Sequence, residues 1–173
     1  DYARGAGDEP LRLASLYAHG LFSNIAQEAE ELAAGNNNRF TLEIDPELPF
    51  VLMLDGQRVR QILINLLANS AKFTHDGAIK LTVECRADAD MPQKIRLLVR
   101  VADTGQGMSA DDRDRAFIPY FRGQNAAATE GAGLGLRIAA LWVKRMGGEI
   151  QLHSVLGIGT EVTVEVPVLV GTI

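Results

Sequence analysis

The sequence has little cysteine, few aromatic residues and no long hydrophobic run. Cys85 is the only cysteine among 173 residues, and aromatic residues make up 6% of the chain. A single cysteine excludes an internal disulfide and a cysteine-based zinc cluster. It is also consistent with a reducing compartment. The longest apolar stretches fall well short of the roughly 20 residues that a membrane-spanning helix needs.

An excess of positive charge is also missing. Lys and Arg number 17 against 22 Asp and Glu, which gives a net charge of −5. Nucleic-acid binding depends on a basic surface, so we expect no nucleic-acid partner. Neither an initiator Met nor a secretory signal is present, and we therefore expect a piece cut from a longer protein. A hydrophobic content of 47% in a chain of this length predicts one domain with a substantial core.

Hydrophobic periodicity divides the chain into alternating helices and strands. The Gly-rich start, residues 1–8, predicts a disordered or linker segment, and residues 9–170 predict a single domain. We expect an α+β fold of two layers, in which a mixed, mostly antiparallel sheet carries about three helices on one face. The expected helices are 11–34, 57–74 and 134–146, and the expected strands are 39–44, 51–54, 79–85, 94–102, 149–153 and 160–166.

The stretch from 57 to 74 predicts an amphipathic helix with one unusual polar face. Asn65, Asn69 and Lys72 recur at three-and-four spacing and therefore share that face. Amide carbonyls are hard oxygen donors that suit Mg²⁺, and the ammonium group suits the phosphates beside it. An ordinary solvated helix face is the alternative interpretation. The apolar face at the same spacing consists of Val59, Ile62, Leu63, Leu66 and Leu67.

Asp103 follows the clearest strand of the chain. It continues the parity of the apolar positions of 94–102, so we expect its carboxylate to point toward the buried side. A buried carboxylate needs a hydrogen-bond donor, and the amino group of adenine is one such donor. The alternative is an aspartate that only caps the turn. Gly105 and Gly107 would let the backbone bend tightly and approach a flat ligand.

A second glycine-rich stretch opens the helix expected at 134–146. Gly131, Gly133 and Gly135 precede or begin it, where the first N–H groups are unpaired and the helix dipole favours anions. This arrangement predicts a phosphate site, although a flexible hinge is an equal alternative. The preceding region, 104–129, is long and weakly periodic, which is typical of a functional or mobile loop.

Taken together, these motifs resemble the catalytic and ATP-binding domain of sensor histidine kinases. That domain has the Bergerat ATP-binding fold of the superfamily that also includes DNA gyrase, mismatch-repair ATPases and a heat-shock chaperone. The resemblance covers nearly all of residues 11–167. The matching segments are 65–74 (Asn box), 103–108 (first glycine box), 117–122 (Phe box, with Tyr120 where Phe is usual), 131–136 (second glycine box) and 154–160 (closing turn).

The resemblance implies ATP and Mg²⁺ as ligands and assigns roles within the boxes. Asn69 would ligate Mg²⁺ with support from Asn65, and Lys72 and Arg122 would neutralise phosphate charge. Asp103 would accept a hydrogen bond from adenine, with Thr160 nearby. Residues 108–130 would form an ATP lid anchored by Phe117 and Phe121, although a plain core role suits these aromatic residues equally. The remaining nucleotide contacts implied are Gly105, Gly107, Gly131, Gly133, Leu134 and Gly135.

One position separates hydrolytic relatives from kinases. The ATPases carry a Glu one turn before the metal Asn, and this chain has Asn65 there, which accepts no proton at neutral pH. We therefore expect transfer of the terminal phosphoryl group to a histidine rather than to water. His19, His75 and His153 lie outside the family's acceptor motif, so that histidine is expected on a separate domain.

The resemblance also implies partners and a location. The domain would serve a dimerisation and phosphoacceptor domain of the same kinase and, indirectly, a response regulator of a two-component system. We expect the isolated domain to be monomeric and to belong to the cytoplasmic part of a sensor kinase. Two alternatives remain open, a regulatory domain that binds another kinase and a Ser/Thr-directed kinase of the anti-sigma type.

Overall fold

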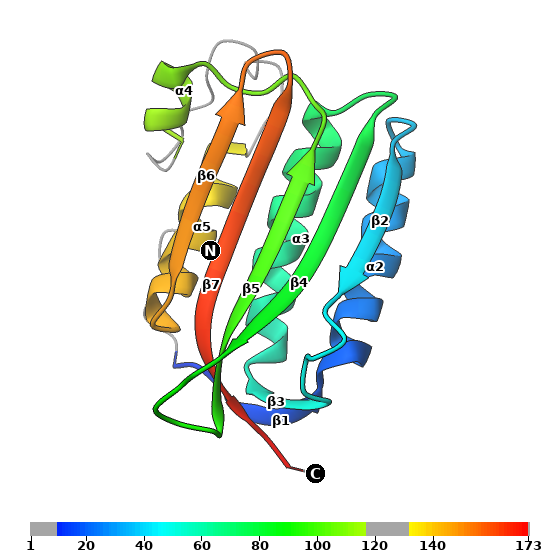
Figure 1. The fold of residues 1–173 in the computed structure, drawn as a ribbon. Coiled ribbons are helices and arrows are strands. Elements are labelled where there is room, and N and C mark those ends of the chain that lie inside the picture. The colour runs from blue at the N-terminus through cyan, green and yellow to red at the C-terminus, as the bar shows by residue number, and fades with distance from the viewer. Residues whose placement is uncertain (1–9, 117–131, 173) are drawn as a thin grey trace.

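The structure, a computed structural model, describes residues 10–116 and 132–172 and has two layers (Figure 1). One layer is a seven-stranded sheet, and the helices α2, α3 and α5 cover one of its faces. This arrangement confirms the expected fold class. The elements are β1 (Ala14–Tyr17), α2 (Ala18–Ala34), β2 (Arg39–Ile44), β3 (Val51–Leu54), α3 (Gly56–Phe73), β4 (Ala78–Ala87), β5 (Lys94–Asp103), α4 (Ala110–Asp114), α5 (Ala132–Arg145), β6 (Glu149–Val155) and β7 (Gly159–Val170).

The sheet is mixed, and β5 and β7 lie near its centre. Its strand order is β1-β3-β7-β5-β4-β2, with β6 also paired to β7. β2 and β4 run parallel, whereas the other paired strands are antiparallel. The register of β5 on β7 places Asp103 opposite Thr160. Two residues from distant parts of the sequence therefore meet at one end of the sheet.

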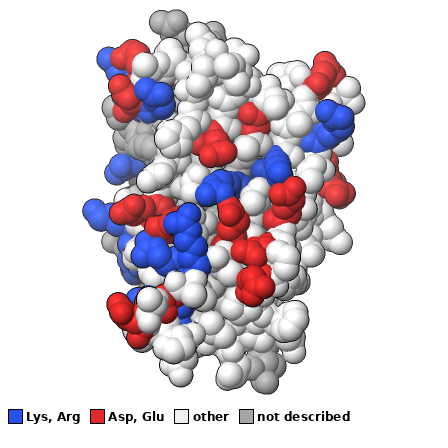
Figure 2. All heavy atoms as spheres, viewed as in Figure 1, with Lys and Arg blue, Asp and Glu red and all other residues white. Residues whose placement is uncertain are grey.

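The two faces of the sheet differ in chemistry. Alternate residues of β5 point toward the helices, and Leu97 and Val101 are each only 1% exposed there. The opposite face is open and carries charges of both signs (Figure 2). Ion pairs cross its strands, including Lys80 with Glu43 at 3.0 Å and Arg100 with Glu84. Such alternation of buried apolar and exposed charged residues is what fixes the register of a half-buried sheet.

The prediction of a helix over residues 11–34 was partly wrong. Residues 14–17 form strand β1, which pairs antiparallel with β3, and α2 begins only at Ala18. The amide of Ala18 donates to the Phe50 carbonyl at 2.9 Å, which holds the chain extended up to that point. The apolar residues of this segment do not all face the core, since Leu13 is 56% and Tyr17 is 62% exposed. Pairing with a strand 37 residues further along overrode the local pattern.

α3 lies at the centre of the helical layer. Its N-cap is Asp55, because the Asp55 side chain accepts a hydrogen bond from the Arg58 amide at 3.1 Å. α2 packs on one side, where Arg60 forms an ion pair with Glu28. α5 packs on the other, where the guanidinium of Arg58 lies 4.2 Å from the ring centre of Trp142. α3 is therefore held on both sides near its N-terminal end.

Candidate functional site

Asp103 is the last residue of β5 and caps the turn that follows. Its Oδ1 atom accepts hydrogen bonds from the amides of Gly105 at 2.9 Å and Thr160 at 3.2 Å. The turn-capping interpretation is therefore correct for this oxygen. These two bonds also fix the orientation of the carboxyl group, so that a ligand would meet it in one defined position.

The environment of Asp103 changes its acidity. Burial raises the pKa of this carboxyl group above its ordinary value, because the charged form loses hydration. The Gly105 and Thr160 amides and the hydroxyls of Ser70 and Thr74 act in the opposite direction, since each stabilises the charged form. The carboxyl group is thus partly desolvated and surrounded by donors.

Thr74 contributes a buried hydroxyl at this point. The residue is fully buried at the end of α3, and its Oγ1 has no partner within hydrogen-bonding geometry among the described residues. It lies close enough to Asp103 to affect its acidity. A buried polar atom without a partner is uncommon, and a bound polar ligand or water would satisfy it. The roles of Ser70 and Thr74 were missed from the sequence, although their spacing of four residues at the end of a helix was a usable signal.

Glycines make the turns around Asp103 possible. A Cβ atom at Gly105 would lie 2.4 Å from the Phe73 carbonyl oxygen. A Cβ atom at Gly107, whose φ is +68°, would lie 2.1 Å from the Val155 carbonyl oxygen. Only glycine avoids such contacts, so any side chain at position 105 or 107 would force the backbone of these turns to shift.

A short hydrogen-bond network holds Thr160 in place. Its hydroxyl lies 2.8 Å from the hydroxyl of Ser154, which is buried and also donates to the Gly159 carbonyl at 3.1 Å. Ser154 in turn accepts from the Met108 amide at 2.8 Å. Ser154 was not among the expected site residues. The network connects the turn after Asp103 to the β6–β7 turn at the same end of the molecule (Figure 1).

The two asparagines of α3 meet the start of α5. Asn65 and Asn69 are half-buried, and neither makes a side-chain hydrogen bond to another described residue. A Cβ atom at Gly135 would lie 3.4 Å from Asn69 Nδ2 and 4.0 Å from the Asn65 Cβ. The fold thus brings the Asn box and the second glycine box into contact. Lys72 is exposed in the last turn of α3.

The remaining expected site residues take no part in the contacts described above or lie outside the described residues. Gly133 and Leu134 fall in the first turn of α5, where unpaired N–H groups favour an anion. Residues 1–8 and most of the expected lid, 108–130, lie outside the described residues. The same holds for Phe117, Phe121, Arg122 and Gly131.

Oxygen donors for a cation are few. Within residues 10–116 and 132–172, no group of three or more His, Cys, Asp or Glu side chains could hold a metal ion. The histidines are dispersed: His75 is exposed just beyond α3, and His153 lies on the open face of the sheet. A hollow of about 310 Å³ near His153 is lined by charged residues of β4 to β7, far from the Asn box on the other side of the sheet. Asn65 and Asn69 carry amide oxygens and lie beside the start of α5.

Comparison with known proteins identifies the family. Residues 54–170 match the family described as histidine kinase-, DNA gyrase B-, and HSP90-like ATPase. The chain therefore belongs to this family. In the part of the chain that the structure describes, we find no helix long and apolar enough to cross a membrane.

Curated relatives are sensor kinases that are much longer than this chain. The sensor histidine kinase RcsC of Escherichia coli (strain K12) is 39% identical over 126 residues, which cover 72% of this chain and 12% of the relative. The aerobic respiration control sensor protein ArcB of the same strain is 34% identical over 153 residues, or 84% of this chain and 19% of the relative. The chain thus spans less than a fifth of these proteins.

Solved structures of kinases share the fold. A crystal structure of full-length ShkA in complex with AMPPNP matches with a TM-score of 0.80 and 32% identity. The match covers 99% of this chain and 35% of the ShkA chain. The nucleotide-free catalytic domain of histidine kinase ThkA has a TM-score of 0.70 and 28% identity, and covers 90% of this chain and 95% of its own. The second comparison shows that a domain of this extent corresponds to a histidine kinase catalytic domain.

Proposed function

We propose that this domain binds ATP with Mg²⁺ and donates the terminal phosphoryl group to a histidine on a separate dimerisation and phosphoacceptor domain. The observation that carries the proposal is the convergence of the two glycine boxes on the Asn box of α3. The turn after Asp103 packs on its C-terminal end, and the start of α5 contacts Asn69. The names of the relatives, which are sensor kinases, point to the same activity.

The site has two ends, which we name by their proposed ligands. The base end comprises Asp103, the glycine turn 105–107, Thr160 and Thr74. Its half-buried carboxyl group suits the amino group of adenine, and the buried Thr74 hydroxyl beside it suits a bridging water. Gly105 and Gly107 let this turn pack directly against the Phe73 and Val155 carbonyls, which holds the Asp103 turn in one position beside the proposed base.

The phosphate end comprises Asn65, Asn69, Lys72 and the first turn of α5. Backbone N–H groups at the start of α5 would bind phosphate oxygens, and Lys72 and Arg122 would neutralise their charge. Mg²⁺ fits the donor set, because Asn65 and Asn69 both carry amide oxygens and both lie beside the start of α5. When bound, Mg²⁺ would supply charge neutralisation on the transferred phosphoryl group.

The donor set favours transfer over hydrolysis. Asn65 stands where a hydrolytic relative carries its general base, and an amide cannot take a proton from water at neutral pH. The proposed nucleophile is an imidazole nitrogen. Its bond to the terminal phosphorus forms as the bond from phosphorus to the bridging oxygen breaks, ADP leaves, and the imidazole loses its N–H proton.

Incubation with γ-labelled ATP tests the proposal. The domain alone should acquire negligible label, because none of the histidines at 19, 75 and 153 lies in an acceptor motif. Addition of a cognate dimerisation domain should produce acid-labile, base-stable label on that domain. Acid-stable, base-labile label would instead support a Ser/Thr-directed kinase. ATP binding without transfer to any acceptor would support the regulatory alternative.

The wider setting follows from the same proposal. The phosphohistidine would pass its phosphoryl group to a response regulator, so that this domain acts on the regulator only indirectly. We also propose a cytoplasmic location, where ATP is available, and a monomeric isolated domain. Sedimentation of the domain with and without ATP analogue would test the last point.

A further inference from the structure

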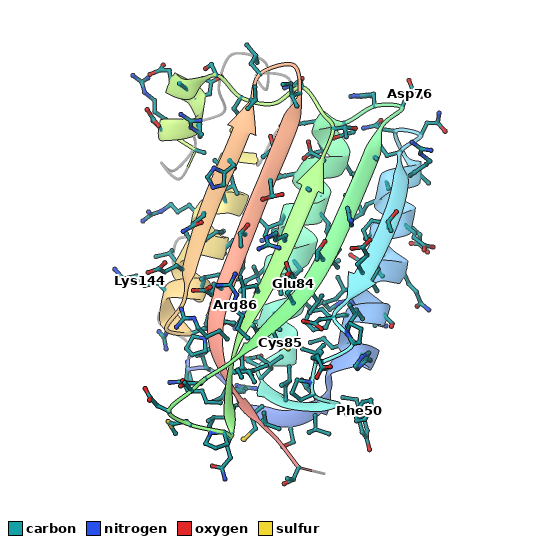
Figure 3. All side chains as sticks on the ribbon, viewed as in Figure 1. Phe50, Asp76, Glu84, Cys85, Arg86 and Lys144 are labelled. Atoms are coloured by element: carbon teal, nitrogen blue, oxygen red, sulfur yellow. The ribbon has the colours of Figure 1, made fainter. Side chains whose placement is uncertain are left out.

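Three consecutive asparagines follow α2 and form a turn against the end of α3. We call residues 36–38 the asparagine turn. Asn37 has a positive φ of 59°, which reverses the chain between α2 and β2. The turn lies at the same end of the molecule as Asp76, which marks the connection from α3 to β4 (Figure 3). In sequence, the turn lies more than 30 residues before the segment that it contacts.

The side chains of the asparagine turn satisfy backbone groups at the end of α3. Asn36 Nδ2 donates to the Ala71 carbonyl and Asn38 Nδ2 to the Thr74 carbonyl, both at 2.7 Å. Asn38 Oδ1 also accepts from the Gly77 amide at 2.9 Å. The last carbonyls of a helix have no partner within the helix, so these bonds supply what the helix cannot. Asn38 is only 8% exposed, and both of its polar atoms are used.

The segment held in this way is the support for the Asp103 turn. The Phe73 carbonyl accepts from the Gln106 amide at 3.1 Å, and the Ala78 carbonyl accepts from the Thr104 amide at 3.1 Å. The Thr74 hydroxyl lies beside the Asp103 carboxyl group. Residues 73–78 thus lie between the asparagine turn on one side and the turn after Asp103 on the other.

We propose that Asn38 is a positioning residue for the base end of the site. By holding the Thr74 carbonyl and the Gly77 amide, it sets the distance between the Thr74 hydroxyl and the Asp103 carboxyl group, and hence the fit of the adenine ring. This inference rests on the proposed function and extends it to a residue outside the recognised motifs. It assigns no role to Asn38 at the phosphate end, whose α3 residues extend from Lys72 back to Asn65, about 2.5 turns before Thr74.

Calorimetry with two ligands separates this role from a general loss of structure. Asn38→Ala should weaken binding of Mg²⁺–ATP by roughly tenfold, since a small displacement of a positioning group has effects of that order. Binding of Mg²⁺–tripolyphosphate, which lacks the base, should change by less than about twofold. A purely structural role would weaken both ligands together, and that result would overturn the proposal.

Asn37→Gly is the matched control. Among the described residues, the Asn37 side chain donates only to the exposed Asp76 Oδ1 at 2.7 Å, and glycine keeps the positive φ, so this variant should bind both ligands as the native domain does. If Asn38→Ala fails to fold, Asn38→Asp keeps the acceptor for Gly77 and replaces the donor to Thr74 with a carboxylate oxygen that repels the Thr74 carbonyl, and the same selective loss is expected. Unchanged ATP binding by a folded Asn38 variant would refute this inference alone. Failure of the native domain to bind ATP would refute the proposed function itself.

Discussion

The two ends of the proposed site are built in different ways. At the base end, the functional groups are fixed by backbone hydrogen bonds and by contacts too close for any side chain, as at Gly105. At the phosphate end, Asn65 and Asn69 project from α3 without hydrogen bonds to other described residues. The groups at the base end therefore also contribute contacts that stabilise the fold, whereas the side chains of Asn65 and Asn69 make no such hydrogen bonds to other described residues.

This difference predicts how mutations should act. A change to the packing at the base end, such as an added methyl group, disturbs contacts that also stabilise the domain, so binding and stability should fall together. A change at the phosphate end removes a group that contributes little to folding, so activity should fall alone. The four predictions that follow test this contrast, beginning with the largest expected effect.

Asn69→Ala should abolish phosphoryl transfer and leave the fold intact. The variant removes the proposed Mg²⁺ ligand, and we expect the transfer rate to fall on the order of a hundredfold or more. The melting temperature should stay within about 2 °C, because the side chain is half-buried and makes no hydrogen bond to the described residues. Quenched-flow transfer to an added acceptor domain and thermal unfolding measure the two effects.

A suitable control for that variant is Asn24→Ala. Asn24 accepts a hydrogen bond from Arg60 on the exposed side of α2, remote from the Asn box. Its variant should transfer at the native rate. Normal transfer by Asn69→Ala would show that the metal assignment is wrong, and the contrast between the two ends would lose its main support.

Asp103→Asn should weaken ATP binding by about 2–4 kcal/mol. Asn retains an oxygen that can accept from Gly105 and Thr160, so the turn should persist. The amide nitrogen, however, would face the adenine amino group, so that two donors would oppose each other. Calorimetric titration with ATP on a folded variant measures the loss, and near-native affinity would exclude the adenine role.

Local rules predicted most of the fold. Alternation along β5 predicted which of its residues face the helices, and three-and-four spacing predicted the buried face of α3. These features depend on neighbours within a few residues, and the sequence displays such neighbours directly. β1 was missed for the opposite reason, because it exists only through pairing with β3.

The site was predicted in part, and the residues that were missed share a cause. Asp103 and the asparagines of α3 were selected from their positions on a strand and a helix. Ser154 and Thr74 act through contacts with distant residues, and no spacing in the sequence shows that Ser154 bonds to Thr160 and Met108. The contact of Gly135 with Asn69 likewise follows from helix packing and not from either motif alone.

Two glycine variants compare the ends directly. Gly105→Ala would place a methyl group 2.4 Å from the Phe73 carbonyl, and we expect a loss of about 1–3 kcal/mol in the free energy of unfolding together with weaker ATP binding. Gly135→Ala would place its methyl group at 3.4 Å from Asn69 Nδ2, close to an ordinary contact. Alanine also favours a helix over glycine by roughly 0.5–1 kcal/mol, so this variant should be at least as stable as the native domain.

Denaturant unfolding and ATP titration of both glycine variants give the comparison. We expect Gly135→Ala to lower ATP affinity only a few-fold, roughly 1 kcal/mol or less, through crowding of the Asn69 amide. If Gly135→Ala were the more destabilised of the two, the distinction between a packed base end and a loosely held phosphate end would be wrong.

The smallest expected effect is a pH dependence that runs in opposite directions for stability and for binding. Burial raises the pKa of Asp103 in the folded domain above its ordinary value, so the folded state holds this proton over a pH range in which the unfolded chain has lost it. Its contribution to stability is therefore complete below the ordinary pKa of about 4 and is lost as pH rises through the raised value. Binding should behave in the opposite sense, since the ionised carboxylate is the better acceptor for adenine, and affinity should fall as pH drops through the same raised value.

Urea unfolding of the native domain and Asp103→Asn between about pH 4 and 7 isolates the first effect as a difference between the two proteins. The ratio of ATP to tripolyphosphate affinity isolates the second, because the titration of the phosphates affects both ligands. Should the stability difference and the affinity ratio both rise with pH, the pKa of Asp103 would be lowered in the folded domain, and hydrogen bonding rather than burial would dominate at the base end.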